Sequence, residues 1–300
     1  MSHLFSAEIK DWDSWSKIFH SIDAWEKLVK FIFEKEMLPF DDVENLQPGT
    51  NAVFKSGGYV VKIFTPAESG LDGKKDFETE CFSLDFAESH GVFTPKLVSK
   101  GIVNDKYCFP YMIMDYISGR DFKQTVLGFS GAQKTAIAGK IREIVFSLNK
   151  PCENFNGVDV ISGKPQNFRW DKFPQSFREE RLEYLKTHSF GERVFVHGDL
   201  SYDNLIIDNS GKIYIIDFAD AVIAPLSYEH GHLVSVLFGF DRDYLSGFFG
   251  NYSYLDLTDL CFDGLLIHDF GGDIIDSEIM EAAGIKSLNE LRNIILRQFR

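Results

Sequence analysis

Two aspartates and one asparagine in the second half of the chain have the types and spacing needed for phosphoryl transfer. In VFVHGDLSYDN (194–204), an apolar run ends just before Asp199, and Asn204 follows five residues later; Asp217 comes 13 residues after Asn204, in IIDFADA. In phosphoryl transfer, one carboxylate orients the acceptor hydroxyl and accepts its proton. An amide oxygen and a second carboxylate hold Mg²⁺ against the nucleotide phosphates. The three residues therefore indicate this chemistry.

The secondary structure expected around these residues brings their side chains together. Short β-prone runs at 205–207 and 212–216 flank an Asn-Ser-Gly turn and predict a β-hairpin. Asp199 precedes the hairpin, Asn204 opens its first strand and Asp217 ends its second, so all three lie at one edge. Each aspartate alone is better explained as a strand cap. The combined spacing favours a catalytic site.

A β-rich segment nearer the N-terminus carries a charged residue within an apolar strand. YVVKIF (59–64) is strongly β-prone and contains Lys62. A buried charge is costly unless it is paired, and the alternative is an edge strand whose lysine points to water. The helix expected at 76–90 offers Glu78 and Glu80 as partners. These two are two positions apart on a helix and cannot both face the same lysine.

The distribution of periodic segments predicts two lobes. A β-rich section is followed, after Ser118-Gly119, by mostly helical sequence, which indicates domains at 1–116 and 117–300, joined near residues 115–119. Apolar residues at helical spacing occur at 12–37, 131–149 and 173–188 and in LNELRNIILRQF near the C-terminus.

Composition excludes several classes of protein. The chain has 300 residues, 44% of them hydrophobic, which is typical of a globular protein. Its formal net charge of −14 argues against binding to nucleic acid or anionic membranes. No apolar run approaches the length of a membrane span, and no signal-peptide pattern is present. Four well-separated cysteines form no metal-binding pair. We therefore expect a cytoplasmic protein with no nucleic-acid or membrane partner; the oligomeric state is left open.

HGDLSYDNLIID followed by IYIIDFADA closely resembles the aminoglycoside phosphotransferase and choline kinase superfamily, the small-molecule branch of the protein-kinase-like fold. That family shows His-x-Asp-x4-Asn and then Ile-Asp-(Phe/Trp). The resemblance implies that Asp199 is the catalytic base, that Asn204 and Asp217 bind Mg²⁺, and that His197 is structural. It also implies an α+β, bilobal fold, with a small antiparallel β-sheet and a helix in the N-lobe and a larger, mainly helical C-lobe.

The same resemblance assigns a nucleotide-binding half to the N-lobe, with ATP or GTP as the phosphoryl donor. Lys62 would contact the α- and β-phosphates and pair with Glu80, with Glu78 as the alternative. Gly49-Thr50-Asn51-Ala52, 10 to 13 residues before Lys62, would be the turn over the phosphates. The remaining nucleotide-binding residues implied are Thr50 and Asn51 in that turn and Met114, Asp115 and Ile117 beside the purine.

The sequence departs from the family after IDFADA. The family commonly continues with Gly-Asp-Pro and a later aspartate, whereas this chain reads AVIAPLSYEHG, with Pro225 retained and Glu229 in place of the later acid. The absence of an Ala-Pro-Glu segment disfavours a protein substrate. These differences leave the expected phosphotransfer residues intact and bear on the acceptor.

The expected activity is transfer of a γ-phosphoryl group to a hydroxyl of an aminoglycoside or similar cationic sugar, an activity associated with antibiotic resistance. Alternative acceptors are choline, homoserine, a macrolide, a ketosamine or another metabolite, and a nucleotide-binding pseudokinase is a further alternative. The acidic residues that could line a cleft for a cation, or simply be solvated, are Asp241, Asp243, Asp256, Asp259, Asp263, Asp269 and Asp273.

Overall fold

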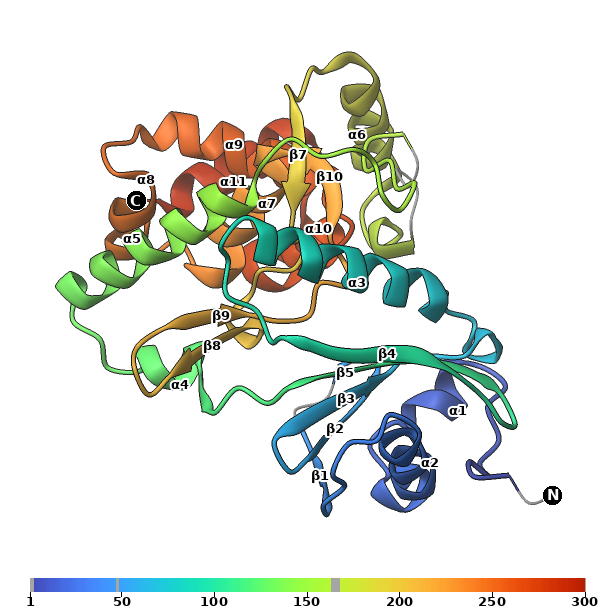
Figure 1. Ribbon diagram of the computed structural model, residues 1–300. Helices are drawn as coiled ribbons and strands as arrows, with labels where there is room; N and C mark the ends of the chain where they lie inside the picture. Colours follow the sequence, from blue (N-terminus) through green and yellow to red (C-terminus); the bar gives the residue numbers. More distant parts are fainter. Residues whose placement is uncertain (1–2, 47–48, 163–167, 300) are drawn as a thin grey trace. The chain divides into compact units, whose positions relative to one another are not determined.

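The computed structural model describes residues 3–46, 49–162 and 168–299 (Figure 1). The chain forms two compact units. We call Met1–Phe86 with Thr94–Ser118 the sheet unit, and Ala87–Phe93 with Gly119–Arg300 the helical unit. The expected α+β architecture, with an antiparallel sheet in one part and mostly helices in the other, is confirmed.

The sheet unit is built on a five-stranded antiparallel sheet in the order β1-β2-β3-β5-β4. Its strands are β1 (Val43–Asn45), β2 (Ala52–Ser56), β3 (Tyr59–Ile63), β4 (Leu97–Asn104) and β5 (Cys108–Asp115). Its helices are α1 (Trp12–Ser16), α2 (Ile22–Lys35) and most of α3 (Gly73–Ser89).

Alternation along β3 directs its side chains to two different neighbours. Val61 and Ile63 join the hydrophobic core that α1 and α2 form with the sheet. Because successive side chains of a strand point to opposite faces, Lys62 points away from that core, and it contacts Glu80 on α3. The strand thus explains how a lysine is buried within an apolar run.

Aromatic rings fill the core between α2 and the sheet. Trp25 is fully buried, with its ring centroid 5.2 Å from that of Phe109 and 4.4 Å from that of Phe5. Its indole Nε1 donates a 2.8 Å hydrogen bond to the carbonyl of Ile18, in the connection between α1 and α2. The periodic segment at 12–37 is therefore two helices, and this hydrogen bond fixes the connection between them.

The helical unit contains two small antiparallel sheets among its helices, in the orders β6-β8-β9 and β10-β7. The strands are β6 (Gly119–Asp121), β7 (Arg193–Val196), β8 (Leu205–Asp208), β9 (Ile213–Ile215) and β10 (Val222–Pro225). The helices are α4 (Phe122–Val126), α5 (Gly131–Leu148), α6 (Gln175–Thr187), α7 (Leu226–His232), α8 (Arg242–Phe249), α9 (Tyr254–Ile267), α10 (Gly271–Ile274) and α11 (Leu288–Gln298). Two π-helical segments, Leu233–Leu237 and Ile275–Ile279, follow α7 and α10.

Glycines allow α7 and α9 to pack at close range. A Cβ on Gly264 would lie 1.9 Å from the carbonyl oxygen of Ser227, and one on Gly231 would lie 3.1 Å from the Cα of Gly264. A side chain at Gly264 would therefore force the two helices apart. This packing sets the position of the polar face of α7, which contributes to the site described below.

No helix in the described part of the chain is both long and apolar enough to cross a membrane.

Replacing Trp25 with Ala should lower the free energy of unfolding by about 3–5 kcal/mol, because it removes a buried ring and its hydrogen bond. Trp12→Ala is the matched control, since that indole is 42% exposed, and it should cost under about 1 kcal/mol. Urea unfolding followed by circular dichroism measures both values. Equal losses in the two variants would contradict this account of the core.

Candidate active site

A β-hairpin in the helical unit places Asn204 and Asp217 next to each other. β8 pairs with β9 so that Leu205 lies opposite Ile215. Beyond that pair, the amide of Ile216 donates a 3.1 Å hydrogen bond to the carbonyl of Asn204. Asp217 follows directly, so Asn204 and Asp217 both lie at the open end of the hairpin.

The backbone at both ends of this segment adopts uncommon conformations. Gly198 has φ +84°, and a Cβ there would lie 2.1 Å from the carbonyl oxygen of Asp220, so only glycine fits. Asp217 has φ +62° although it is not a glycine. Non-glycine residues in this region are uncommon and are found preferentially at functional sites. The turn at Gly198 sets the direction in which the chain enters Asp199.

His197 connects the loop to the hairpin. Its ring is fully buried, with Nε2 3.0 Å from the carbonyl oxygen of Ile216, and its Nδ1 accepts a 3.2 Å hydrogen bond from the amide of Asp199. Because Nδ1 is an acceptor, the ring proton lies on Nε2. Burial lowers the pKa of His197, which favours this neutral form. The contacts agree with the structural role that the resemblance implies.

Asp199 and Asn204 are bonded to each other. The Nδ2 group of Asn204 donates to the backbone carbonyl of Asp199 at 2.7 Å and to its Oδ2 at 3.0 Å. Both amide protons are thereby used on Asp199, which leaves the side-chain oxygen of Asn204 as the available ligand atom. The amide is held in one orientation beside the carboxylate.

The donor set fits Mg²⁺ together with a phosphate ligand. Within the described ranges, no group of three or more His, Cys, Asp or Glu side chains is arranged to hold a metal by itself. The oxygen of Asn204 and the carboxylate of Asp217 are hard oxygen donors. Mg²⁺ is commonly bound through one or two such protein ligands, with water and substrate phosphates completing its shell.

Glu229 on α7 braces the loop from the interior. Its Oε2 accepts a 2.5 Å hydrogen bond from the amide of His197. The side chain is almost completely buried, and burial raises its pKa to about 7. Glu229, which stands where the family has a later aspartate, thus binds the backbone of the loop shortly before Asp199.

His232, one turn after Glu229 on α7, also contacts Asp199. Its Nε2 lies 3.3 Å from Oδ1 of that carboxylate. Sequence analysis did not single out His232. Its spacing from Glu229 could have indicated it, because residues three positions apart on a helix share a face and Glu229 was already a candidate.

In the sheet unit, Lys62 pairs with Glu80 and not with Glu78. Lys62 Nζ lies 2.6 Å from Glu80 Oε2, and both side chains are buried. Glu78 instead forms an exposed 3.7 Å ion pair with Lys74 on its own helix. The geometry therefore separates the two glutamates that the sequence left as alternatives.

The turn before Lys62 uses its polar groups partly within the protein. Asn51 is buried and its Oδ1 accepts a 3.3 Å hydrogen bond from the amide of Thr65. Thr50 is exposed, and its carbonyl accepts a 2.9 Å bond from Nε1 of Trp15. The side chain of Asn51 supports the turn, which leaves the hydroxyl of Thr50 and backbone amides to meet a ligand. Pro48, which precedes this turn in the sequence, lies outside the described residues.

The three residues expected beside the purine lie at the end of β5 and just after it. Met114 is buried and pairs with Val60. The amide of Asp115 donates to the carbonyl of Lys96 at 3.0 Å. Ile117 is half-buried and follows the last residue of the strand by two positions. The amide of Ile117 lies beyond the strand, whereas that of Asp115 is used inside the sheet.

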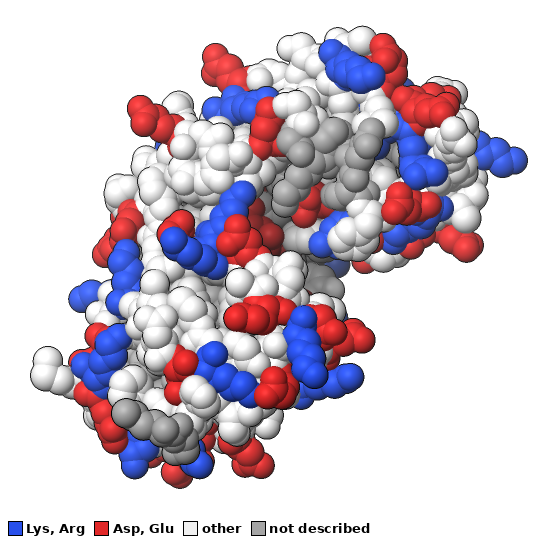
Figure 2. Space-filling model, turned by 90° about the vertical axis from the view of Figure 1, so that its right-hand side faces the viewer, with Lys and Arg blue, Asp and Glu red and all other residues white. Residues whose placement is uncertain are grey.

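Most of the aspartates considered for a cationic acceptor are bonded to partners within the helical unit. Asp241 pairs with Lys134 at 2.6 Å, and Asp273 pairs with Lys172 at 2.7 Å and also with Arg169. In the view of Figure 2, acidic and basic side chains are interspersed. These bonds support structural roles for the aspartates concerned.

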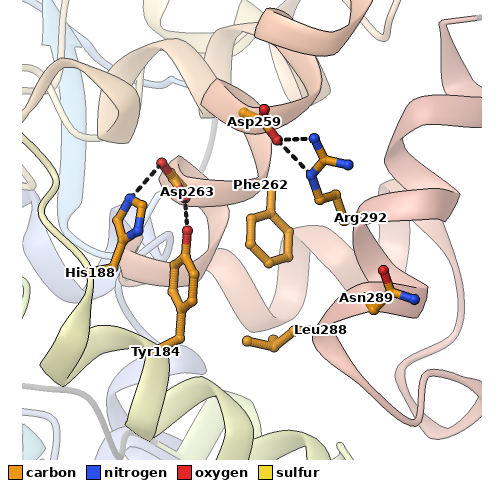
Figure 3. A pocket seen from close by; sticks show the side chains of 8 residues that line it. All are labelled: Tyr184, His188, Asp259, Phe262, Asp263, Leu288, Asn289 and Arg292. Atoms are coloured by element: carbon orange, nitrogen blue, oxygen red, sulfur yellow. Dashed lines mark hydrogen bonds and ion pairs between the residues drawn. The ribbon is translucent and has the colours of Figure 1, made fainter.

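A pocket of about 450 Å³ in the helical unit shows the same internal pairing (Figure 3). Asp259 lies 2.6 Å from Arg292, and Asp263 accepts a 2.6 Å hydrogen bond from the hydroxyl of Tyr184 and lies 3.1 Å from His188. None of the expected catalytic or metal-binding residues lines this pocket. Its charged groups bind one another, so the pocket is not the candidate active site.

Comparison with known proteins agrees with the resemblance seen in the sequence. Residues 162–260, about a third of the chain, match the model of a family described as "Phosphotransferase enzyme family", and this segment includes Asp199, Asn204 and Asp217. No curated protein sequence matches the chain.

Solved structures with this fold include several kinases of small molecules. The GDP complex of wild-type aminoglycoside 2'-phosphotransferase-IIIa is 18% identical with a TM-score of 0.59, over 91% of this chain and 98% of that chain. The streptomycin-ATP-APH(2")-IIa ternary complex is 17% identical with a TM-score of 0.59, over 91% and 97%. Choline kinase LicA from Streptococcus pneumoniae is 17% identical with a TM-score of 0.58, over 90% and 98%. At this identity the likeness establishes the fold, which is the protein-kinase-like fold expected from the sequence.

The buried carboxyl of Glu229 should make stability depend on pH. Its pKa in the folded protein, about 7, lies above the ordinary value of 4.5, so its contribution to stability is fully present below about pH 4.5 and is lost as pH rises through 7. Glu229→Gln keeps an acceptor for the amide of His197 but does not ionise. Relative to this variant, the wild type should lose about 2–3 kcal/mol between pH 5 and pH 8. Urea unfolding at each pH measures the difference.

Glu78→Gln is the control for that measurement, because Glu78 is exposed, and it should follow the wild-type pH dependence. If Glu229→Gln also followed the wild type, the burial of an uncharged Glu229 would be wrong.

Proposed function

We propose that this chain, whose catalytic-loop residues and fold resemble those of the aminoglycoside phosphotransferases and choline kinases, is a small-molecule kinase. It transfers the γ-phosphoryl group of ATP or GTP to an alcohol group and acts in the cytoplasm. The observation that carries the proposal is that the Asn204 side chain is bonded to Asp199, while the backbone pairing of Ile216 with Asn204 brings Asp217 to the same end of the hairpin.

In the proposed mechanism, Asp199 accepts a hydrogen bond from the acceptor hydroxyl, aims its oxygen at the γ-phosphorus and takes up its proton. Transfer is direct and in line, without a phosphoenzyme, so catalysis comes from positioning and charge stabilisation. Asn204 and Asp217 would hold Mg²⁺, which neutralises charge on the phosphates when bound. His197 and Glu229 keep the loop that carries Asp199 in place.

The sheet unit would bind the nucleotide. Lys62, held by Glu80, presents an ammonium group to the α- and β-phosphates, and the turn at Thr50 and Asn51 offers a hydroxyl and backbone amides. Met114, Asp115 and Ile117 would lie beside the purine, with the amide of Ile117 as a hydrogen-bond donor. Support comes from the buried ion pair and from the use of the neighbouring amide of Asp115 inside the sheet.

An aminoglycoside or similar cationic sugar is the first candidate for the acceptor, because several structures with this fold are named as aminoglycoside phosphotransferases. Such an acceptor would make the protein an antibiotic-resistance enzyme. The second candidate is a less highly charged metabolite. It is favoured by the pairing of Asp241, Asp259 and Asp273 with cationic side chains, since paired carboxylates have less charge to offer a polycation.

The test is a panel of aminoglycosides, choline, homoserine, sugars and macrolides with Mg²⁺ and either ATP or GTP. Release of nucleoside diphosphate and the mass of the product are both measured. Asp199→Ala should lower kcat by about 10²–10⁴-fold, because the group that orients the hydroxyl and accepts its proton is gone, while nucleotide binding persists. Asp217→Ala should also weaken Mg²⁺-dependent nucleotide binding.

Asp203→Ala is the matched control, since Asp203 is an exposed aspartate in the same loop, and it should turn over at a rate close to wild type. Wild-type turnover by both Asp199→Ala and Asp217→Ala would show the site assignment to be wrong. Nucleotide binding without transfer to any acceptor would instead favour a pseudokinase.

A further inference from the structure

His232 is a buried polar side chain placed directly behind the carboxylate of Asp199. It occupies the last position of α7, and its side chain is 3% exposed, whereas that of Asp199 is 33% exposed. The imidazole Nε2 lies 3.3 Å from Oδ1 of Asp199. The histidine therefore meets the aspartate from the protein interior and leaves its outer side open to a substrate.

We propose that His232 is a positioning residue for the reaction, which fixes the orientation of the Asp199 carboxylate by a hydrogen bond from Nε2 to Oδ1. This inference rests on the proposed function, in which Asp199 is the base. The other carboxylate oxygen, Oδ2, accepts a 3.0 Å bond from Nδ2 of Asn204. Contacts on both oxygens, from an amide nitrogen on one and an imidazole nitrogen on the other, restrain rotation of the carboxylate about its Cβ–Cγ bond. Each oxygen keeps a second lone pair for the acceptor hydroxyl.

The surroundings of His232 hold its ring in place. The ring stacks on His268 with centroids 5.0 Å apart, and His268 stacks on Tyr228 at 4.1 Å. His268 is itself fixed, because its Nδ1 accepts a 3.1 Å bond from the amide of Phe270. This column of three rings joins α7 to the end of α9, two helices whose close approach depends on Gly264.

Packing alone does not account for a histidine at this position. Nδ1 of His232 is buried and has no hydrogen-bond partner among the described residues. A buried polar atom without a partner is destabilising, and an apolar ring of similar size would avoid that penalty while keeping the stacking. The polar contact of the imidazole is with Asp199. The contact with Asp199, which orients its carboxylate, thus explains why an imidazole occupies this position.

The test compares two substitutions of His232, one that keeps an aromatic ring without a hydrogen-bond donor and one that keeps a donor without the ring. His232→Phe keeps a stacked ring and removes the hydrogen bond, so kcat should fall about 10- to 100-fold, as expected for a misplaced catalytic group. The KM for nucleotide and the melting temperature should stay near wild type. His232→Gln carries an amide nitrogen at about the position of Nε2 and should recover most of the lost kcat.

The matched control is His230→Phe, in the same helix. His230 is also buried, with its ring centroid 5.6 and 5.7 Å from those of Phe248 and Phe249. Its replacement should leave kcat unchanged. All variants are assayed with Mg²⁺ and ATP or GTP, first with water as the acceptor and then with the acceptor turned over fastest in the panel.

The pattern of results separates this inference from the proposed function. Loss of turnover in Asp199→Ala together with wild-type kcat in His232→Phe would overturn the inference alone. Equal losses of kcat and melting temperature in His232→Phe and His232→Gln would also overturn it, because the role would then be structural. A wild-type protein without turnover, or an active Asp199→Ala variant, would contradict the proposed function and the inference with it.

Discussion

The hydrogen bond from the amide of His197 to the buried carboxyl of Glu229 is the interaction on which the candidate site depends. It attaches the loop to α7 immediately before Gly198, where glycine is required by its positive φ and by the nearby carbonyl of Asp220. The direction of the following residue, Asp199, is thereby set by a helix and not by a flexible turn. A buried carboxyl group is costly, and the raised pKa of Glu229 shows that burial dominates its surroundings.

The sheet unit contains a buried pair of ionisable side chains, Lys62 and Glu80. Such pairs are commonly no more stabilising than well-packed apolar residues of the same volume, because both charges lose their hydration. Stability therefore gives little reason to keep this pair in the core. A requirement for a fixed ammonium group facing phosphate oxygens does give a reason, and it supports the proposed role of Lys62. Each unit therefore has buried ionisable side chains in the segment for which chemistry is proposed, Glu229 in the helical unit and Lys62 with Glu80 in the sheet unit.

The parts of the site that depend on local spacing could be predicted from the sequence. The hairpin between Asn204 and Asp217 and the strand around Lys62 followed from short-range patterns, and the structure contains both. Sequence analysis did not find β10, a four-residue strand ending in Pro225 that pairs with β7, or the contact of His232 with Asp199. Both arise from residues brought together by helix and strand packing across long stretches of chain. The cationic partner of Asp241 lies 107 residues away, so its pairing was equally inaccessible.

The proposed site requires that Asn204 and Asp217 hold the metal of a bound nucleotide beside Asp199. The most direct measurement is a crystal structure with Mn²⁺ and a non-hydrolysable nucleotide, in which anomalous scattering locates the metal. We expect a peak within bonding distance of the Asn204 side-chain oxygen and the Asp217 carboxylate, with phosphate oxygens completing the shell. A nucleotide bound with its metal on other residues, and with Asn204 and Asp217 unchanged from their present contacts, would contradict the account.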